Sequence, residues 1–218
     1  MDKAETLIKE LKNPDWEIRA EAARKLGDLR SRRAVPALIE MARNERVYFA
    51  RNEAMRALGR IKDVRAVPAL IEALNAPEVT GVPANSNEHF ERSWIQIAAV
   101  ETLGEFKDMH AVPDMLERLG CDHLQSRVVK SLGKISGRVD AQQRKAIVGK
   151  LIEFTRSDWF MGEMRRNSPF YEKSANAFAD MLSKMKASEQ RETMLEPRIR
   201  APASCKGKAR LKRAIAIC

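Results

Sequence analysis

Apolar residues recur along the chain at the spacing of one face of a helix. In the first such segment, Ile18, Ala22 and Leu26 are four residues apart, so all three would lie on one side of a helix. Two later segments repeat the spacing, at Ala50, Ala54 and Leu58 and at Ile95, Ala99 and Leu103. The small alanine in the middle predicts that neighbouring helices approach closely there. The pattern predicts an all-α chain of amphipathic helices.

The chain is also internally repeated. Residues 19–40 and 51–72 are identical at 14 of 22 positions with an offset of 32 residues. A third copy covers residues 96–117, and a fourth, at residues 125–133, keeps only its Leu-Gly pair. Because such a unit is too short to fold alone, successive units are expected to stack on one another.

Glycine and proline mark the expected ends and beginnings of helices. One glycine follows the last strong apolar residue of each copy, where a left-handed C-terminal cap is expected; these are Gly27, Gly59, Gly104 and Gly133. Three prolines then stand where the next helix should begin, a position that tolerates proline because its missing N–H has no intrahelical partner; they are Pro36, Pro68 and Pro113. Each unit therefore reads as helix, turn, helix.

These residues resemble a known repeat. The chain has Asn-Pro-Asp at 13–15, Ile-Arg at 18–19, paired alanines, Leu-Gly and then Ala-Val-Pro-Ala-Leu at 34–38, which resembles the short HEAT-like repeat of phycobilisome lyases. The resemblance extends over residues 13–136 and implies a right-handed α-α superhelix, a solenoid of about five helix pairs. We expect the solenoid to occupy residues 1–190, with an irregular C-terminal cap from about residue 137, and a basic tail to follow at 191–218.

The charge is concentrated in that tail. The chain has 40 basic and 30 acidic residues, a net charge of +10, and from Arg198 onward there are seven basic residues and no acidic one. The body is therefore nearly balanced, and the tail is the expected contact for nucleic acid, if one is bound. No segment has the apolar length of a signal peptide or membrane helix, and three widely spaced cysteines fit reduced thiols, so a cytoplasmic protein is expected.

The helices that carry the Leu-Gly pairs, which we call the second helices of the pairs, share a column of equivalent positions. This column is the first candidate binding surface. Three of its four members are basic, Arg24, Arg56 and Lys130, and the fourth is Glu101. We expect these helices to line a concave face, where the column could meet an acidic protein or phosphate. In the alternative interpretation, Glu21 and Glu53, three residues before an arginine, form intrahelical ion pairs with it on a solvated face.

Two departures from the repeat offer further candidates. The third copy begins 13 residues late, and the extra residues predict an exposed loop at 76–93; its end carries His89, Phe90, Arg92 and Trp94. Residues 157–171 are rich in aromatics, methionine and arginine, a composition typical of interfaces; the candidates there are Trp159, Arg165 and Arg166. In the alternative interpretations, residues 76–93 are a tolerated insertion and residues 157–171 form the core of a divergent C-terminal cap.

Catalytic constellations are missing from the sequence. It has no glycine-rich phosphate loop, no His-Glu-x-x-His and no Gly-x-Ser-x-Gly, and Cys121-Asp122-His123 lacks further ligands. We therefore predict no catalytic residue, metal or cofactor, and a scaffold or adaptor that binds another protein through the concave face and the 76–93 loop. The resemblance leaves a bilin lyase-like, chromophore-handling factor as one alternative, and nucleic-acid binding is the other.

Overall fold

The computed structural model describes residues 2–76, 87–106, 108–121 and 123–155, and the side chains of residues 87–91 and 155 lie outside the description. All regular elements in these ranges are helical, which confirms the all-α prediction. The chain folds as two compact units, residues 1–114 and 115–218. None of the described helices is both long and apolar enough to span a membrane.

The first unit holds three helix pairs. In chain order the elements are α1 (Lys3–Glu10), α2 (Trp16–Asp28), the 3₁₀ turn η1 (Arg32–Ala34), α3 (Val35–Asn44), α4 (Tyr48–Ile61), η2 (Val64–Ala66), α5 (Val67–Leu74), α6 (Asn87–Leu103) and η3 (Met109–Ala111). Helix α7 (Val112–Glu117) contains the boundary between the units. In the second unit, η4 (Arg118–Gly120), α8 (Gln125–Ser136) and α9 (Ala141–Thr155) follow.

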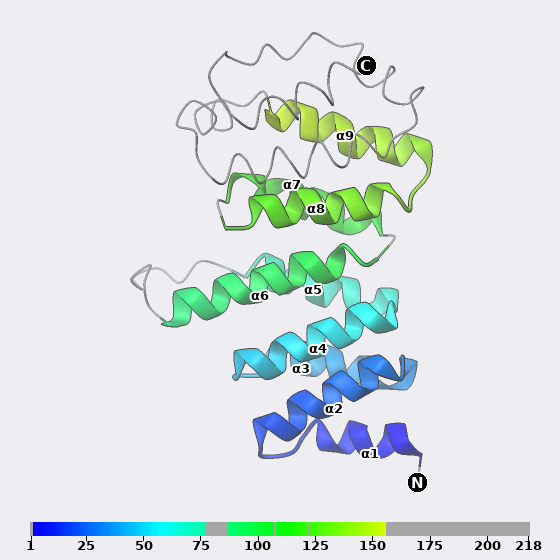
Figure 1. Ribbon diagram of the computed structural model, residues 1–218, viewed down its shortest axis with the longest axis vertical. Helices are drawn as coiled ribbons and strands as arrows, with labels where there is room; N and C mark the ends of the chain where they lie inside the picture. Colours follow the sequence, from blue (N-terminus) through cyan, green and yellow to red (C-terminus); the bar gives the residue numbers. More distant parts are fainter. Residues whose placement is uncertain (1, 77–86, 107, 122, 156–218) are drawn as a thin grey trace. The chain divides into compact units, whose positions relative to one another are not determined.

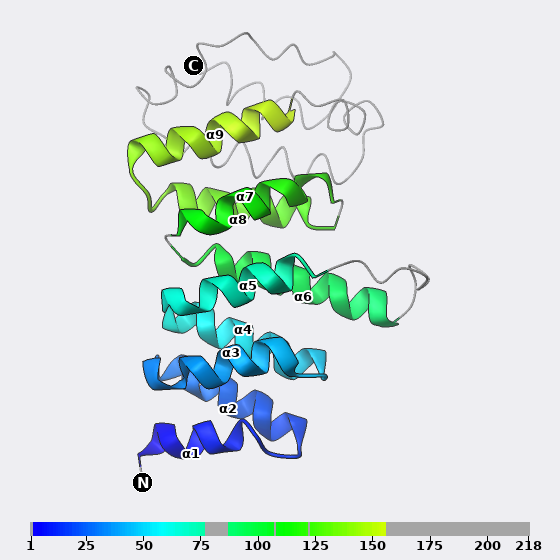
Figure 2. The ribbon, with the colours of Figure 1, turned by 180° about the vertical axis from the view of Figure 1, so that it is seen from behind.

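The helices of the first unit form two layers. The second helices α2, α4 and α6 pack on one another in sequence and lie in front in Figure 1, whereas α1, α3 and α5 are in front in Figure 2. Fully buried leucines and methionine fill the space between the layers. The middle alanines of the apolar pattern, Ala22, Ala54 and Ala99, are at most 1% exposed, as the close approach of helices requires. The solenoid of HEAT-like pairs is thus confirmed.

The prolines and the glycines both mark helix ends as predicted, but the glycines do not have the expected left-handed backbone. Pro36 and Pro68 stand in the first turns of α3 and α5. Gly27 and Gly59 lie in the last turns of α2 and α4, one and two residues before the helix ends. Neither has the left-handed backbone of a cap, so only that part of the prediction is wrong. A Cβ on Gly27 would lie 2.8 Å from the Cα of Ala57. Glycine is needed because the next second helix passes too close for a side chain.

The left-handed cap positions are occupied by basic residues instead. Arg30 and Lys62, each three residues after a repeat glycine, have φ of 48° and 57°. A non-glycine residue in this region is uncommon. Basic side chains at these positions lie at helix C-termini, where positive charge is favourable.

Two other expectations are corrected. Residues 87–93 of the predicted loop 76–93 belong instead to α6, which begins at Asn87. No proline or glycine occurs between Asn87 and Leu103, so the helix gains one hydrogen bond per added residue. Ile18, the first member of the apolar pattern, is 40% exposed. It lies in the first turn of α2, while the helix's buried residues begin at Ala22.

A recurring polar contact joins the two helices of a pair. The side chain of Arg51 donates to the backbone oxygen of Ala42 at 2.6 Å, and Gln96 donates to that of Leu74 at 3.2 Å. In the fourth copy Gln125 donates to the oxygen of Leu119 at 3.2 Å. Each acceptor is near the C-terminal end of the preceding helical segment, where carbonyls lack intrahelical partners. This inter-helix clamp satisfies a carbonyl that would otherwise be buried without a hydrogen bond.

Candidate functional site: the exposed face of the second helices

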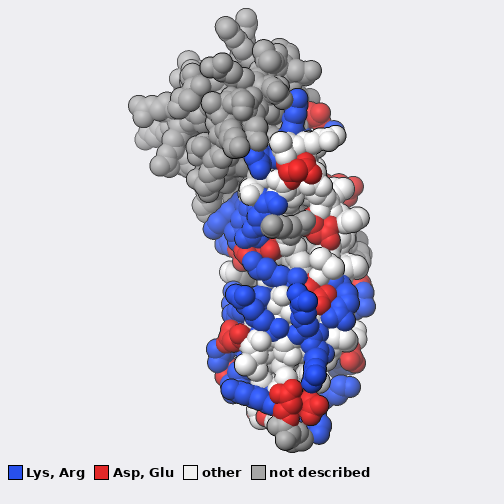
Figure 3. Space-filling view, turned by 90° about the vertical axis from the view of Figure 1, so that its right-hand side faces the viewer, with Lys and Arg blue, Asp and Glu red and all other residues white. Residues whose placement is uncertain are grey.

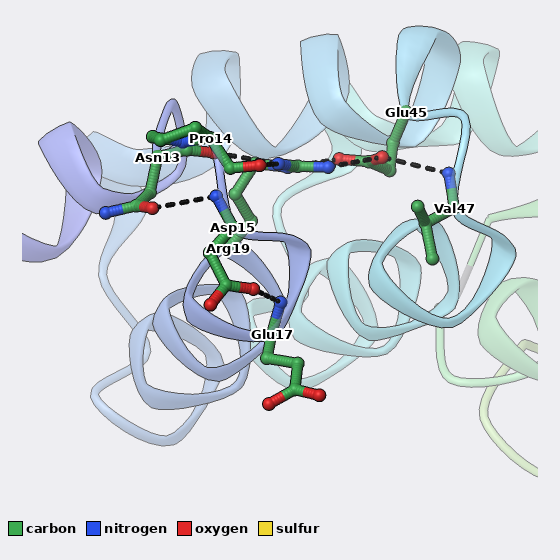
Figure 4. A network of polar contacts seen from close by, with 7 residues as sticks. All are labelled: Asn13, Pro14, Asp15, Glu17, Arg19, Glu45 and Val47. Carbon is green, nitrogen blue, oxygen red and sulfur yellow. Dashed lines mark hydrogen bonds and ion pairs between the residues drawn. The ribbon is translucent and has the colours of Figure 1, made fainter.

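A polar network fixes the beginnings of α2 and α4. The guanidinium of Arg19 makes two hydrogen bonds to the carboxylate of Glu45, at 2.6 and 2.8 Å. On its other side it donates to the backbone oxygens of Asn13 at 2.7 Å and Pro14 at 2.9 Å. Figure 4 shows this guanidinium held between the carboxylate and the turn before α2. The network therefore joins the turns of two successive repeats.

The same network caps α2 and holds Val47, the residue that precedes α4. Asp15 accepts from the N–H of Glu17 at 2.9 Å, and Glu45 accepts from the N–H of Val47 at 2.9 Å (Figure 4). Such bonds satisfy N–H groups that have no partner within the helix. The hydrogen bond from Arg19 lowers the pKa of the Glu45 carboxyl, although burial opposes the shift. The carboxylate is thus ionised and paired at neutral pH.

This support positions two exposed aromatic residues, Trp16 and Phe49, and the half-buried Tyr48 beside them; we call the three the aromatic patch. Trp16 and Phe49 stack with ring centroids 6.2 Å apart, and the rings of Tyr48 and Phe49 are 4.0 Å apart. Trp16 is 37% exposed and Phe49 is 55% exposed. Large rigid rings that remain in solvent are typical of surfaces that bind another protein.

Sequence reasoning missed the aromatic patch. Trp16 and Tyr48 occupy equivalent positions of the repeat, 32 residues apart, and that equivalence was the available signal. The predicted candidate Trp94 is the counterpart of Phe49 on α6, offset by 45 residues, and is 39% exposed. Each second helix of the first unit therefore carries an aromatic residue at or next to this position of the repeat.

Toward their C-terminal ends the same helices carry paired charges. Arg24 binds Glu21 at 2.7 Å and Asp28 at 3.1 Å. Arg56 binds Glu53 at 3.2 Å, as the ion-pair interpretation predicts, and Arg60 approaches Asp28 of the preceding helix at 3.6 Å. We call these residues, 21, 24, 28, 53, 56 and 60, the charge ladder. The hydrogen bond from Arg24 lowers the pKa of Glu21 to about 2, so the Glu21 carboxylate stays ionised at neutral pH.

The other predicted candidate residues lie in different environments, and some fall outside the described residues. Arg92 is half-buried and donates to the backbone oxygen of Ala76 at 2.8 Å, which gives it a structural contact at the end of α5. Lys130 is exposed on α8 in the second unit. The side chains of His89 and Phe90 lie outside the described residues, as do Trp159, Arg165 and Arg166 and the tail. Of the predicted set, Arg24, Arg56 and Trp94 are exposed on second helices of the first unit.

Comparison with known proteins agrees with this architecture. Residues 4–85 match the family model of HEAT repeats. No curated protein matches the sequence. Within the described residues, no group of three His, Cys, Asp or Glu side chains could hold a metal ion.

Solved structures of similar fold extend over the whole chain. The complex of CpcE and CpcF of phycocyanin lyase from Nostoc sp. PCC7120 is 18% identical, with a TM-score of 0.50, covering 99% of this chain and 94% of that chain. An engineered protein is 18% identical with a TM-score of 0.53, covering 100% and 98%. A designed armadillo repeat protein is 10% identical with a TM-score of 0.50, covering 99% of each chain. These likenesses show the fold, a HEAT- or armadillo-like α-solenoid, and residues 4–85 match the HEAT-repeat family.

Proposed function

We propose that this chain is a non-catalytic scaffold that binds another protein through the exposed face of its second helices. The observation that carries the proposal is the aromatic patch, in which Trp16 and Phe49 stack yet remain 37% and 55% exposed. Burying such rings against a partner removes apolar surface from water. A repeat solenoid supplies the extended surface that a protein partner needs.

The charge ladder would surround the contact with polar groups. Its arginines are held by neighbouring carboxylates, and Arg24 and Arg56 keep 47% and 55% of their side chains exposed. Pairs of this exposure contribute little to stability, so they can change partners at small cost. Charges of both signs around an aromatic centre favour selection among partners over raw affinity.

The test is capture of a partner from native cell extract, followed by measurement with the purified partner. The variant Trp16→Gln with Phe49→Gln removes the aromatic patch without changing net charge. The matched control, Lys12→Gln with Glu40→Gln, also keeps the net charge and alters two exposed side chains outside the patch, one just after α1 and one on α3. Far-ultraviolet circular dichroism verifies that both variants fold.

The proposal expects one protein to be retained after nuclease treatment by the intact chain and by the control. The patch variant should bind that purified protein about 30-fold more weakly, the effect of losing an aromatic hot spot. Equal binding by patch variant and control would contradict the assignment of this face. Recovery of a coloured tetrapyrrole client would favour the chromophore-handling alternative, and recovery of only nuclease-sensitive material would favour nucleic-acid binding.

A further inference from the structure

A second surface of the first unit carries an excess of positive charge. The turns after α2 and α4, residues 28–33 and 60–65, hold six basic residues and two acidic ones, a net charge of +4. We call the six the basic turn edge; they are Arg30, Arg32, Arg33, Arg60, Lys62 and Arg65. Figure 3 looks onto the side where these turns lie, and blue predominates over red there.

The opposite edge of the same unit provides a comparison. There the turns before α2 and α4, residues 10–16 and 43–48, hold three basic and three acidic residues. Most of the polar network of Figure 4 lies at that edge. The positive excess is therefore a property of one edge and not of the repeat in general.

Two contacts organise the basic turn edge. Arg65 donates to the backbone oxygen of Arg32 at 3.3 Å, which joins the two turns, and its own ion pair with Asp63 measures 2.7 Å. Arg30 and Lys62 occupy equivalent left-handed positions, where glycine would cost less. Both repeats thus place a cation at a position of unfavourable backbone conformation.

Local carboxylates pair with four of the six cations of the edge. The pairs Arg33–Asp2, Arg60–Asp28 and Lys62–Glu105 are 3.5 to 3.6 Å long, and exposed pairs of this kind contribute little. Within the part of the chain that the structure describes, Arg30 and Arg32 form no ion pair. These cations are available to an anionic partner.

The apolar residues of the edge indicate which partner. Leu29 is 47% exposed and Val64 is 64% exposed, and both stand between the arginines. Neither turn contains an aromatic residue, whereas single-stranded nucleic acids are held by stacking on aromatic rings. Aliphatic side chains have no contact to make with a phosphate backbone, but they can bury apolar side chains of a peptide.

We propose that the basic turn edge binds an acidic segment of another polypeptide in which carboxylates are interspersed with aliphatic side chains. The carboxylates pair with the arginines, and the aliphatic side chains cover Leu29 and Val64. Successive helices are about 10 Å apart, so an extended segment of about ten residues, ~33 Å long, is sufficient to cross the turns. This surface is distinct from the aromatic patch, and the two proposals can fail separately.

Fluorescence anisotropy with labelled probes on the full chain tests the proposal. The first probe is a peptide of about ten residues with the repeating sequence Glu-Glu-Leu, and the second has serine in place of leucine. The third is an oligothymidylate of about ten nucleotides. The test variant, Arg30→Glu with Arg32→Glu, changes two cations that form no described ion pair. The control, Lys12→Glu with Arg46→Glu, makes the same change of net charge at the opposite edge.

The leucine peptide should bind most tightly, and the test variant should weaken it about 10-fold while the control changes it less than about 2-fold. Equal weakening by test variant and control would overturn the proposal, because net charge alone would then explain binding. Tighter binding of the oligothymidylate, lost steeply with salt, would assign the edge to nucleic acid instead. Absence of peptide binding would refute it outright.

Discussion

Replacing Gly27 by alanine should destabilise the first unit, although alanine is the better helix former. The added Cβ would lie 2.8 Å from the Cα of Ala57 and 3.0 Å from its Cβ. Ordinary van der Waals contact begins at 3.4 Å, so α2 and α4 must move apart by about 0.6 Å in a close-packed interior. The contact is with backbone, which cannot rotate away.

The magnitude follows from two opposing effects. Overpacking costs about 1–3 kcal/mol, and the alanine recovers about 0.5–1 kcal/mol of helix propensity. We expect a net loss of about 1 kcal/mol in the free energy of unfolding, and of at most about 2.5 kcal/mol. The Tm should fall by roughly 2–4 °C for each kcal/mol lost. Urea and thermal unfolding of the full chain, followed by circular dichroism, measure both quantities.

Two further substitutions calibrate the result. A Cβ on Gly149 in α9 would meet none of the residues that the structure describes within 4 Å, so Gly149→Ala should stabilise by about 0.5–1 kcal/mol. A Cβ on Gly59 would meet the methyl of Thr102 at 3.0 Å, and its effect should be intermediate because a side chain can adjust. If Gly27→Ala stabilises as much as Gly149→Ala does, the close approach is refuted.

A double variant tests directly whether contact with Ala57 makes alanine unfavourable at Gly27. Adding Ala57→Gly removes the contact at 3.0 Å and leaves the one at 2.8 Å. Close packing therefore predicts partial relief, a favourable coupling of about 0.5–1 kcal/mol between the two sites. Additive effects would instead favour a local backbone cause.

Three further predictions concern polar groups. Glu45→Gln should lower the free energy of unfolding by about 1.5–3 kcal/mol, the range for hydrogen bonds to charged groups, because Arg19 loses its carboxylate partner. Urea unfolding measures the loss. A loss below about 1 kcal/mol, the value of an exposed ion pair, would contradict the prediction. Gln96→Leu should cost about 1–3 kcal/mol by leaving the carbonyl of Leu74 buried without its donor, with faster amide exchange at the end of α5 as the readout. The pKa of Glu21 is lowered from 4.5 to about 2 and that of Asp63 from 3.8 to about 2, so their contribution to stability is complete above about pH 5 and lost as the pH falls toward 2. Thermal unfolding from pH 7 to 2 should show a fall in Tm that Glu21→Gln diminishes. An unchanged pH profile in that variant would count against the Glu21–Arg24 pair.

Local patterns predicted the helices because their causes are local. Proline at a helix beginning and the pair of Glu21 with Arg24 each depend on residues within one turn. The packing role of Gly27 depends on Ala57, 30 residues later, and no property of its own helix reveals it. Glycine suits both a left-handed cap and a close helix contact, so the sequence alone favoured the cap, which is the wrong explanation.

The polar network could not be predicted for a similar reason. Arg19 and Glu45 are 26 residues apart, and only the stacking of two repeats brings them together. The clamp had a usable signal, since a long polar side chain stands eight residues before the glycine in every copy; these are Arg19, Arg51, Gln96 and Gln125. Aligning the copies for polar as well as apolar positions would have found it.

The inter-helix clamp has a consequence for how this chain can be modified. The two bonded residues are nine positions apart in the second pair and 22 apart in the third. The contact therefore forms with either length of connecting chain. The longer connection adds only about 0.8 kcal/mol of closure entropy. The connection after α5 is therefore a natural insertion point, at which a foreign binding segment or a reporter peptide can be grafted while the helix pair keeps its register.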